Sequence, residues 1–154
     1  MKLIPILAVA LCSLAALAQT GGSAEVFSGK DVAAQLTALV DKAKPSGSSG
    51  AVLGDYKSHA IRLSVRTASG GAEIHAHYDD IFVVTDGSAT LITGGTVIDP
   101  KTGADGETKG TRIQDGKSQT ITKDDIVHIP AGTPHQLIIA PGSSFSTIVV
   151  KVKE

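Results

Sequence analysis

The chain has 154 residues and a formal net charge of −1, from 14 lysine and arginine residues against 15 aspartate and glutamate residues. This length fits one domain with a substantial core. The near-neutral balance, without a basic cluster, excludes nucleic acid as an expected partner. With 3% aromatic residues, the core must be built from Val, Ile, Leu and Ala.

Residues 1–18 have the pattern of a secretory signal peptide. Lys2 gives a short positive start, residues 3–17 are almost wholly apolar, and Ala16-Leu17-Ala18 is a small-x-small cleavage signal. The apolar run is short for a spanning helix, and an uncleaved membrane anchor is the alternative. We therefore predict an exported protein, in the periplasm or outside the cell, with no membrane span after cleavage.

Cleavage also changes the charge and the cysteine content. It removes one lysine and no acidic residue, so the formal net charge goes from −1 to −2. It removes Cys12, which is the only cysteine. The mature protein therefore has no disulfide of its own despite an oxidising destination, and its core must hold it together.

Residues 19–50 are predicted to contain one amphipathic helix and a linker. Apolar residues recur at helical spacing from Val32 to Ala43, Ser28 precedes the pattern and Pro45 stops it. We expect this helix to pack against the outside of the main fold or against a partner subunit. The turn formers of residues 46–50 are typical of a linker.

From residue 51 to residue 154 the pattern is that of strands. Ile61, Leu63 and Val65 alternate with polar residues, so Arg62 and Arg66 should lie on the opposite face. If the apolar residues are buried in the barrel, the two arginines cover its outside, unless a bulge reverses the faces.

The following segments continue the strand pattern. Residues 72–77 form a predicted strand, and the apolar run 81–84 ends at Asp86-Gly87, a strong hairpin signal. Residues 99–116 suggest an exposed hairpin or loop. Four further short strands complete an all-β, antiparallel sandwich or barrel.

Histidines mark a candidate site on these strands. His75 and His77 are one residue apart on a predicted strand and should project to the same face, with Glu73 beside them. His135 follows on a distant strand. Neutral imidazoles with one carboxylate suit a divalent transition metal such as Zn, Fe, Mn, Ni or Cu. The alternative is that the histidines are polar fillers of a narrow barrel that holds no metal.

The motifs resemble those of the cupin superfamily. The first cupin motif, G-x5-H-x-H-x3,4-E-x6-G, is similar to His75-x-His77 followed by Asp80 and, six residues later, Gly87. The second, G-x5-P-x-G-x2-H-x3-N, is similar to the stretch from Asp124 through Pro130-x-Gly132 to His135. The resemblance implies a single-domain, double-stranded jelly-roll β-barrel over residues 51–154, and it allows a homodimer. The metal ligands that it implies are His75, His77, Asp80 and His135.

The chain departs from the motifs at three positions. Asp80 replaces the glutamate and lies only two residues after His77, Asp124 replaces a glycine, and Ile139 replaces the final asparagine. A shorter acid after a shorter turn weakens the fourth ligand more than the fold. Glu73 is therefore the rival carboxylate, or a partner of a ligand histidine.

Two functions follow from this sequence. The first is a metal-dependent enzyme of the cell envelope, an oxygenase, isomerase or decarboxylase acting on a small polar molecule at a His-ligated metal. The second is a non-catalytic barrel that binds a small ligand. No catalytic residue besides the metal ligands can be named from the sequence, and the same barrel hosts many chemistries.

Overall fold

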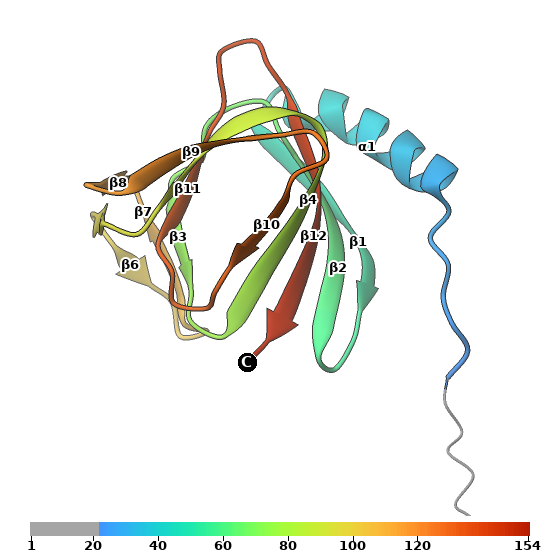
Figure 1. Ribbon diagram of the computed structural model, residues 1–154, viewed down its shortest axis with the longest axis horizontal. Coiled ribbons are helices and arrows are strands. Elements are labelled where there is room, and N and C mark those ends of the chain that lie inside the picture. Colours follow the sequence, from blue (N-terminus) through green and yellow to red (C-terminus); the bar gives the residue numbers. More distant parts are fainter. Residues whose placement is uncertain (1–21) are drawn as a thin grey trace, which may run out of the picture.

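The computed structural model describes residues 22–154, so the predicted signal peptide, residues 1–18, lies outside the described residues. The described part is mostly antiparallel β-structure with a single α-helix (Figure 1). No helix within it is long and apolar enough to span a membrane. In chain order the elements are α1 (Gly29–Ala43), β1 (Ser48–Asp55), β2 (His59–Arg66), β3 (Ala72–His75), β4 (Tyr78–Thr93), β5 (Thr96–Ile98), β6 (Lys101–Thr102), β7 (Glu107–Gly110), β8 (Arg112–Gln114), β9 (Lys117–Thr122), β10 (Ile126–Ile129), β11 (His135–Ile138) and β12 (Phe145–Lys153).

Ten strands belong to one hydrogen-bonded sheet that curls into a barrel (Figure 1). Its main path runs β1-β2-β12-β4-β11-β3-β7-β6, while β9 and β10 also pair with β4, and β5 and β8 form a separate ribbon. Strand β4 joins the two halves. Its first part pairs with β12 and β10, and its second part pairs with β11 and β9. The predicted all-β architecture with one N-terminal helix is confirmed.

The hairpin predicted at Asp86-Gly87 is wrong, because β4 continues through these residues and bends there. Gly87 has φ 78°, and the register with β12 shifts between Ser146 and Thr147, which marks a β-bulge. A Cβ on residue 87 would collide with the carbonyl oxygen of Ser144, so only glycine fits. The same turn signal that predicts a hairpin here allows one strand to serve both halves of the barrel.

Helix α1 has the predicted position and caps. The Ser28 side chain accepts a hydrogen bond of 3.1 Å from the Asp31 amide and so caps the first turn. The acidic side chain of Asp31 lies in the first turn and the basic side chain of Lys42 in the last, so the charges at both ends suit the helix dipole. Strand β1 begins at Ser48, inside the stretch predicted as a linker. Gly47, with φ 81°, makes the turn between the helix and this strand.

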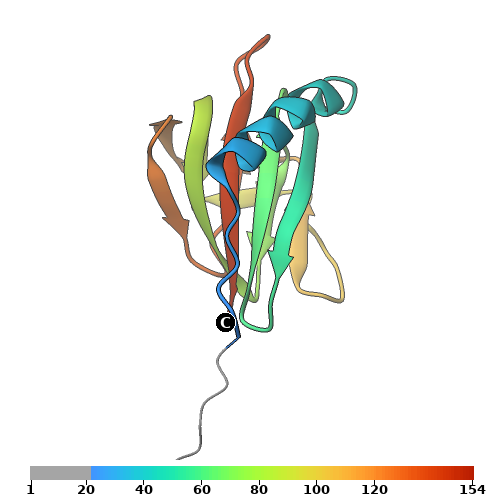
Figure 2. The ribbon, with the colours of Figure 1, turned by 90° about the vertical axis from the view of Figure 1, so that its right-hand side faces the viewer.

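The helix lies across the outer face of β1 and β2 (Figure 2). Leu36, Leu39 and Ala43 of the helix form one buried cluster with Leu63 and Val65 of β2. The apolar face of β2 is therefore the outer face of the sheet, and the helix covers it.

The expectation that Arg62 and Arg66 cover the outside of the barrel is therefore wrong. Since Leu63 and Val65 face the helix, the arginines project into the barrel, where both line a cavity. Strand alternation shows that the two sets of residues lie on opposite faces. It does not show which face a helix will cover.

A second apolar cluster lies inside the barrel. It combines residues from both halves of the barrel, most of them aliphatic, as the low aromatic content requires. Its buried members are Phe82, Val84, Ala89, Leu91, Ile121, Ile129, Leu137, Ile139, Phe145 and Val149. Phe82, Leu137 and Val149 of this cluster also line the cavity, together with the polar residues of the candidate site.

Candidate metal centre

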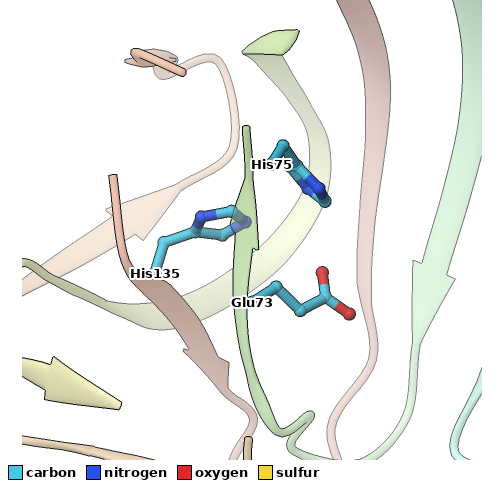
Figure 3. A group of neighbouring side chains, drawn as sticks. All are labelled: Glu73, His75 and His135. Carbon is cyan, nitrogen blue, oxygen red and sulfur yellow. The ribbon is translucent and has the colours of Figure 1, made fainter. Parts of the chain in front are cut away.

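Glu73, His75 and His135 bring three potential ligand atoms together, all within 4.8 Å of one another (Figure 3). Glu73 and His75 are two residues apart on β3 and so share a face of the strand. His135 on β11 is the direct cross-strand partner of Glu73. Side chains in such pairs start about 5 Å apart, so strand alternation and register alone assemble the group.

The ring of His135 is oriented with one nitrogen free. Its Nδ1 lies 3.0 Å from the carbonyl oxygen of Thr133, which can only accept a hydrogen bond, so Nδ1 carries the proton. Nε2 is then left with its lone pair. The side chain is 4% exposed, and burial lowers the pKa of His135, outweighing the backbone hydrogen bond that raises it. His135 is thus a neutral imidazole that can act as a ligand.

His75 lies between two carboxylates. Its Nδ1 contacts Glu107, the residue opposite it on β7, and its Nε2 lies 3.2 Å from Asp80 Oδ2. Burial lowers the pKa of His75, but the hydrogen bond and the charge of Asp80, with the hydrogen bond of Glu107, outweigh burial and raise it overall. Since both ring nitrogens face carboxylates, the arrangement favours the protonated form of His75.

Asp80 is buried and doubly paired. It is 4% exposed, and its Oδ1 accepts a hydrogen bond of 2.6 Å from Lys151 Nζ, its cross-strand partner on β12. Burial raises the pKa of Asp80, but the hydrogen bonds from His75 and Lys151 outweigh burial and lower it. Asp80 is therefore an ionised carboxylate at the edge of the group. It touches His75 but lies outside the compact set that contains Glu73.

His77 is placed apart from the other histidines. The strand predicted over residues 72–77 ends at His75, and Ala76 and His77 form an exposed turn that carries the chain to β4. The ring of His77 lies near Gly106 of the β6–β7 connection. The turn is needed because Tyr78 already pairs with β12, on the other half of the barrel. The two histidines therefore do not share a strand face.

Of the four residues predicted as ligands, the structure brings His75 and His135 together, and the rival carboxylate Glu73 completes this set. Asp80 contacts His75 from outside the set, and His77 lies apart. Two imidazoles and one carboxylate are the donors of the facial triad found in non-haem iron enzymes, and they also suit zinc or manganese. Glu107 holds the far nitrogen of His75, as carboxylates commonly do for ligand histidines. The donor set fits a divalent transition metal once His75 gives up a proton.

The group forms part of the wall of a cavity of about 750 Å³. This volume is within the usual range for small-molecule sites. Besides the two histidines, the lining carries five basic and five acidic side chains, so their formal charges cancel. The basic residues are Arg62, Arg66, Lys109, Lys151 and Lys153, and the acidic residues are Asp55, Glu73, Asp80, Asp105 and Glu107.

Two of the pairing residues were not found from the sequence. Glu107 lies in the Gly- and Thr-rich stretch predicted as an exposed hairpin, and only its register opposite His75 reveals its role. Lys151 continues the inward-facing set of β12, after Thr147 and Val149. A charged residue that continues an apolar alternation was the one signal available in the sequence.

Comparisons with known proteins agree on the fold. No family model and no curated protein matches the chain. Among similar solved structures are the DMSP lyase DddQ from Ruegeria pomeroyi (TM-score 0.52, 15% identity, 71% of this chain and 49% of that one) and the polyketide cyclase RemF from Streptomyces resistomycificus (TM-score 0.52, 17% identity, 71% and 67%). A third is the Cnp3 cupin domain from Schizosaccharomyces pombe (TM-score 0.51, 12% identity, 70% and 62%).

The likeness to these structures concerns the fold, because the identities are low. Together with the observed strand pairing, it defines the described chain as a double-stranded jelly-roll β-barrel. This is the cupin fold, which confirms the fold predicted from the two histidine motifs. The aligned part spans about half of the length of the lyase, 49%.

The pairing of Lys151 with Asp80 should contribute substantially to stability. Lys151→Met leaves a buried carboxylate with His75 as its remaining partner, since the two side chains are only 15% and 5% exposed. We expect the free energy of unfolding of the metal-free protein to fall by about 3 kcal/mol in urea denaturation at pH 7. The control is Lys44→Met, because the pair of Lys44 with Asp41 is 66% and 78% exposed. It should leave the free energy of unfolding nearly unchanged, because solvent screens this exposed pair. Equal losses would contradict a buried ion pair.

The two histidines should titrate in opposite directions from an ordinary histidine. In chelator-treated protein, NMR titration of the imidazole nitrogens should give His75 a pKa above about 6.5 and His135 a pKa below it. Asp80→Asn removes one carboxylate partner and should bring the pKa of His75 down. A His75 that titrates below His135 in the unaltered protein would rule out the arrangement between two carboxylates.

Proposed function

We propose that this chain is a metal-binding cupin whose ion is held by His75, His135 and a carboxylate, and that it acts on a small polar molecule in the cavity. The observation that carries the proposal is the convergence of Glu73, His75 and His135 within 4.8 Å at the wall of a 750 Å³ cavity. Glu73 is the favoured carboxylate, since Asp80 is already paired with Lys151. An oxygenase, isomerase or decarboxylase reaction is consistent with this site.

Each residue has a separate role in this proposal. A divalent metal, when bound, supplies Lewis-acid activation of an oxygen ligand. Glu107 orients His75 through Nδ1, and the Thr133 carbonyl orients His135 in the same way. Asp80 and Lys151 place a carboxylate and an ammonium group beside the ligand set, where they can hold or transfer a proton. The site therefore contains potential acid–base groups as well as metal ligands.

A non-catalytic ligand-binding barrel is the second candidate function. One observation favours it: both ring nitrogens of His75 already lie next to carboxylates, so His75 has two hydrogen-bond partners without a metal. In that case the charged network would shape a polar pocket for a small ligand. The lyase and the cyclase with similar folds are enzymes by their names, which favours the first candidate but at the level of fold alone.

Metal content tests the first proposal and separates the candidate ligands. The mature protein, purified without an affinity tag or chelator, should contain about one equivalent of a transition metal by elemental analysis. His75→Ala and His135→Ala should lose it. His128→Ala is the matched control, since this exposed histidine pairs with Asp79 away from the group. The His77→Ala variant should keep the metal if the observed geometry holds.

Other outcomes would change the proposal in specific ways. Loss of metal in His77→Ala would restore the ligand set that the motifs predicted. Glu73→Gln and Asp80→Asn distinguish the two carboxylates in the same measurement, because both changes remove a charge and preserve shape. If the protein binds no metal after reconstitution with each candidate ion, the metal proposal is refuted, and the non-catalytic ligand-binding barrel remains as the candidate function.

Export is also part of the proposal, and it is supported by the signal-peptide pattern of residues 1–18. When the full chain is expressed with a bacterial export pathway present, intact mass measurement should find a protein that begins at Gln19. Changing Ala16 and Ala18 to bulky residues should block cleavage and leave the longer species. A soluble intracellular product of full length from the natural chain would contradict export. A homodimer, which the resemblance to cupins allows, stays a prediction.

A further inference from the structure

Strand β2 presents two arginines to the cavity. Arg62 is the cross-strand partner of Val149, and Arg66 is the partner of Phe145, two members of the inner core cluster. Paired residues in an antiparallel sheet lie on the same face, so both guanidinium groups belong to the inner wall. The helix-covered outer face holds the apolar residues between them.

Neither guanidinium is fully matched by a carboxylate. Arg66 Nη2 is 3.9 Å from Glu73 Oε1, longer than the 2.7–2.9 Å of a good charge-assisted hydrogen bond. Within residues 22–154, Arg62 has no ion-pair partner at all. Lys109, which stands opposite Glu73 on β7 and also lines the cavity, has none among the same residues. Three cations are thus available to a ligand.

The charge balance of the cavity changes if a metal binds, and this step rests on the proposed function. The five basic and five acidic residues of the lining cancel formally. A divalent ion would add two positive charges to this balance. The loaded cavity would therefore carry an excess of positive charge, and ligation of Glu73 would leave Arg66 without its nearest carboxylate.

We propose that the cavity binds a small molecule carrying an oxyanion, a carboxylate or a phosphate, held by Arg62 and Arg66 beside the metal centre. Arg66 stands within 4 Å of Glu73, so an anion that it binds lies in the same compartment as the two histidines. Guanidinium groups bind such oxyanions in a two-point, planar arrangement. Few rings line the cavity, Tyr78 and Phe82 beside the histidines, so recognition rests on charge more than on stacking.

Calorimetric titration with propionate, inorganic phosphate and neutral propionamide tests this subsite. Both chelator-treated and metal-reconstituted protein should be used. We expect one or both anions to bind in preference to propionamide, and more tightly in the reconstituted protein. Arg66→Gln and Arg62→Gln should each weaken anion binding about tenfold, the size expected for one charge-assisted hydrogen bond. The relative affinities for propionate and phosphate show whether the subsite prefers a carboxylate or a phosphate.

The matched control is Arg112→Gln. It makes the same change of charge on β8, at an exposed position outside the cavity lining, and should leave anion binding unchanged. Because Arg66 is partly buried, circular dichroism must show that its variant is folded. Arg62 is exposed at the cavity wall and provides the variant least able to disturb folding.

The outcomes separate this inference from the metal proposal. Equal binding of propionate and propionamide, or loss in Arg112→Gln as large as in the cavity variants, would overturn the anion subsite even in protein that holds its metal. Arginine-dependent anion binding in protein that never retains a metal would uphold the subsite and refute the metal proposal. Anion binding that needs neither arginine would place the ligand elsewhere and reject the inference.

Discussion

Cross-strand register builds the site, and three pairs account for most of it. Glu73 is opposite His135, His75 is opposite Glu107, and Asp80 is opposite Lys151. Each pair joins strands far apart in the sequence, and each places two polar side chains on the inner face. A slip of one residue in any of these pairings would turn a member outward. The apolar residues that alternate with them and fill the rest of the barrel resist such a slip.

Helix α1 makes the polar interior compatible with a stable fold. A β2 strand with no outer cover would have to bury its apolar residues inside the barrel, and its arginines would then face outward. The helix forms a second core with the outer face of the sheet, in which Leu39 and Val65 are buried. The apolar residues of β2 are therefore buried under the helix and not inside the barrel. The inward face of β2 is then free to carry Arg62 and Arg66. The barrel is stabilised from two sides of one sheet, and the cavity occupies part of the space between its halves.

Local patterns predicted most of the elements and part of the site. The helix from Gly29 to Ala43, the all-β class and the late strands follow from periodicity and capping, which act over a few residues. The errors concern what distant segments do to a local pattern. Gly87 has the signal of a hairpin, but pairing with β12 makes it a bulge inside β4. Arg62 was assigned to the outside because alternation does not reveal where the helix packs.

The candidate site divides in the same way. His75 and His135 could be found from the motifs, because glycine and proline spacing marks where strands end. Glu107 could not be found, since nothing near it in the sequence points to His75. His77 shares a motif with His75, yet the chain needs its backbone for the turn into β4, so the two rings separate. Spacing indicates which residues are close along the chain, while register decides which ones meet.

The position of His75 makes metal and proton competitors for the same nitrogen. Without a metal, Nε2 points at Asp80, and the two carboxylates around the ring favour the charged form. If His75 holds a metal through Nε2, it would first have to lose the proton there, and Asp80 would then lie beside the bound cation. Asp80 would not become an unpaired buried charge, because Lys151 also bonds to it. The same network would therefore suit both a protonated, metal-free barrel and a metal-loaded one. This explains why one geometry supports two candidate functions and why metal affinity should strengthen as protons are removed.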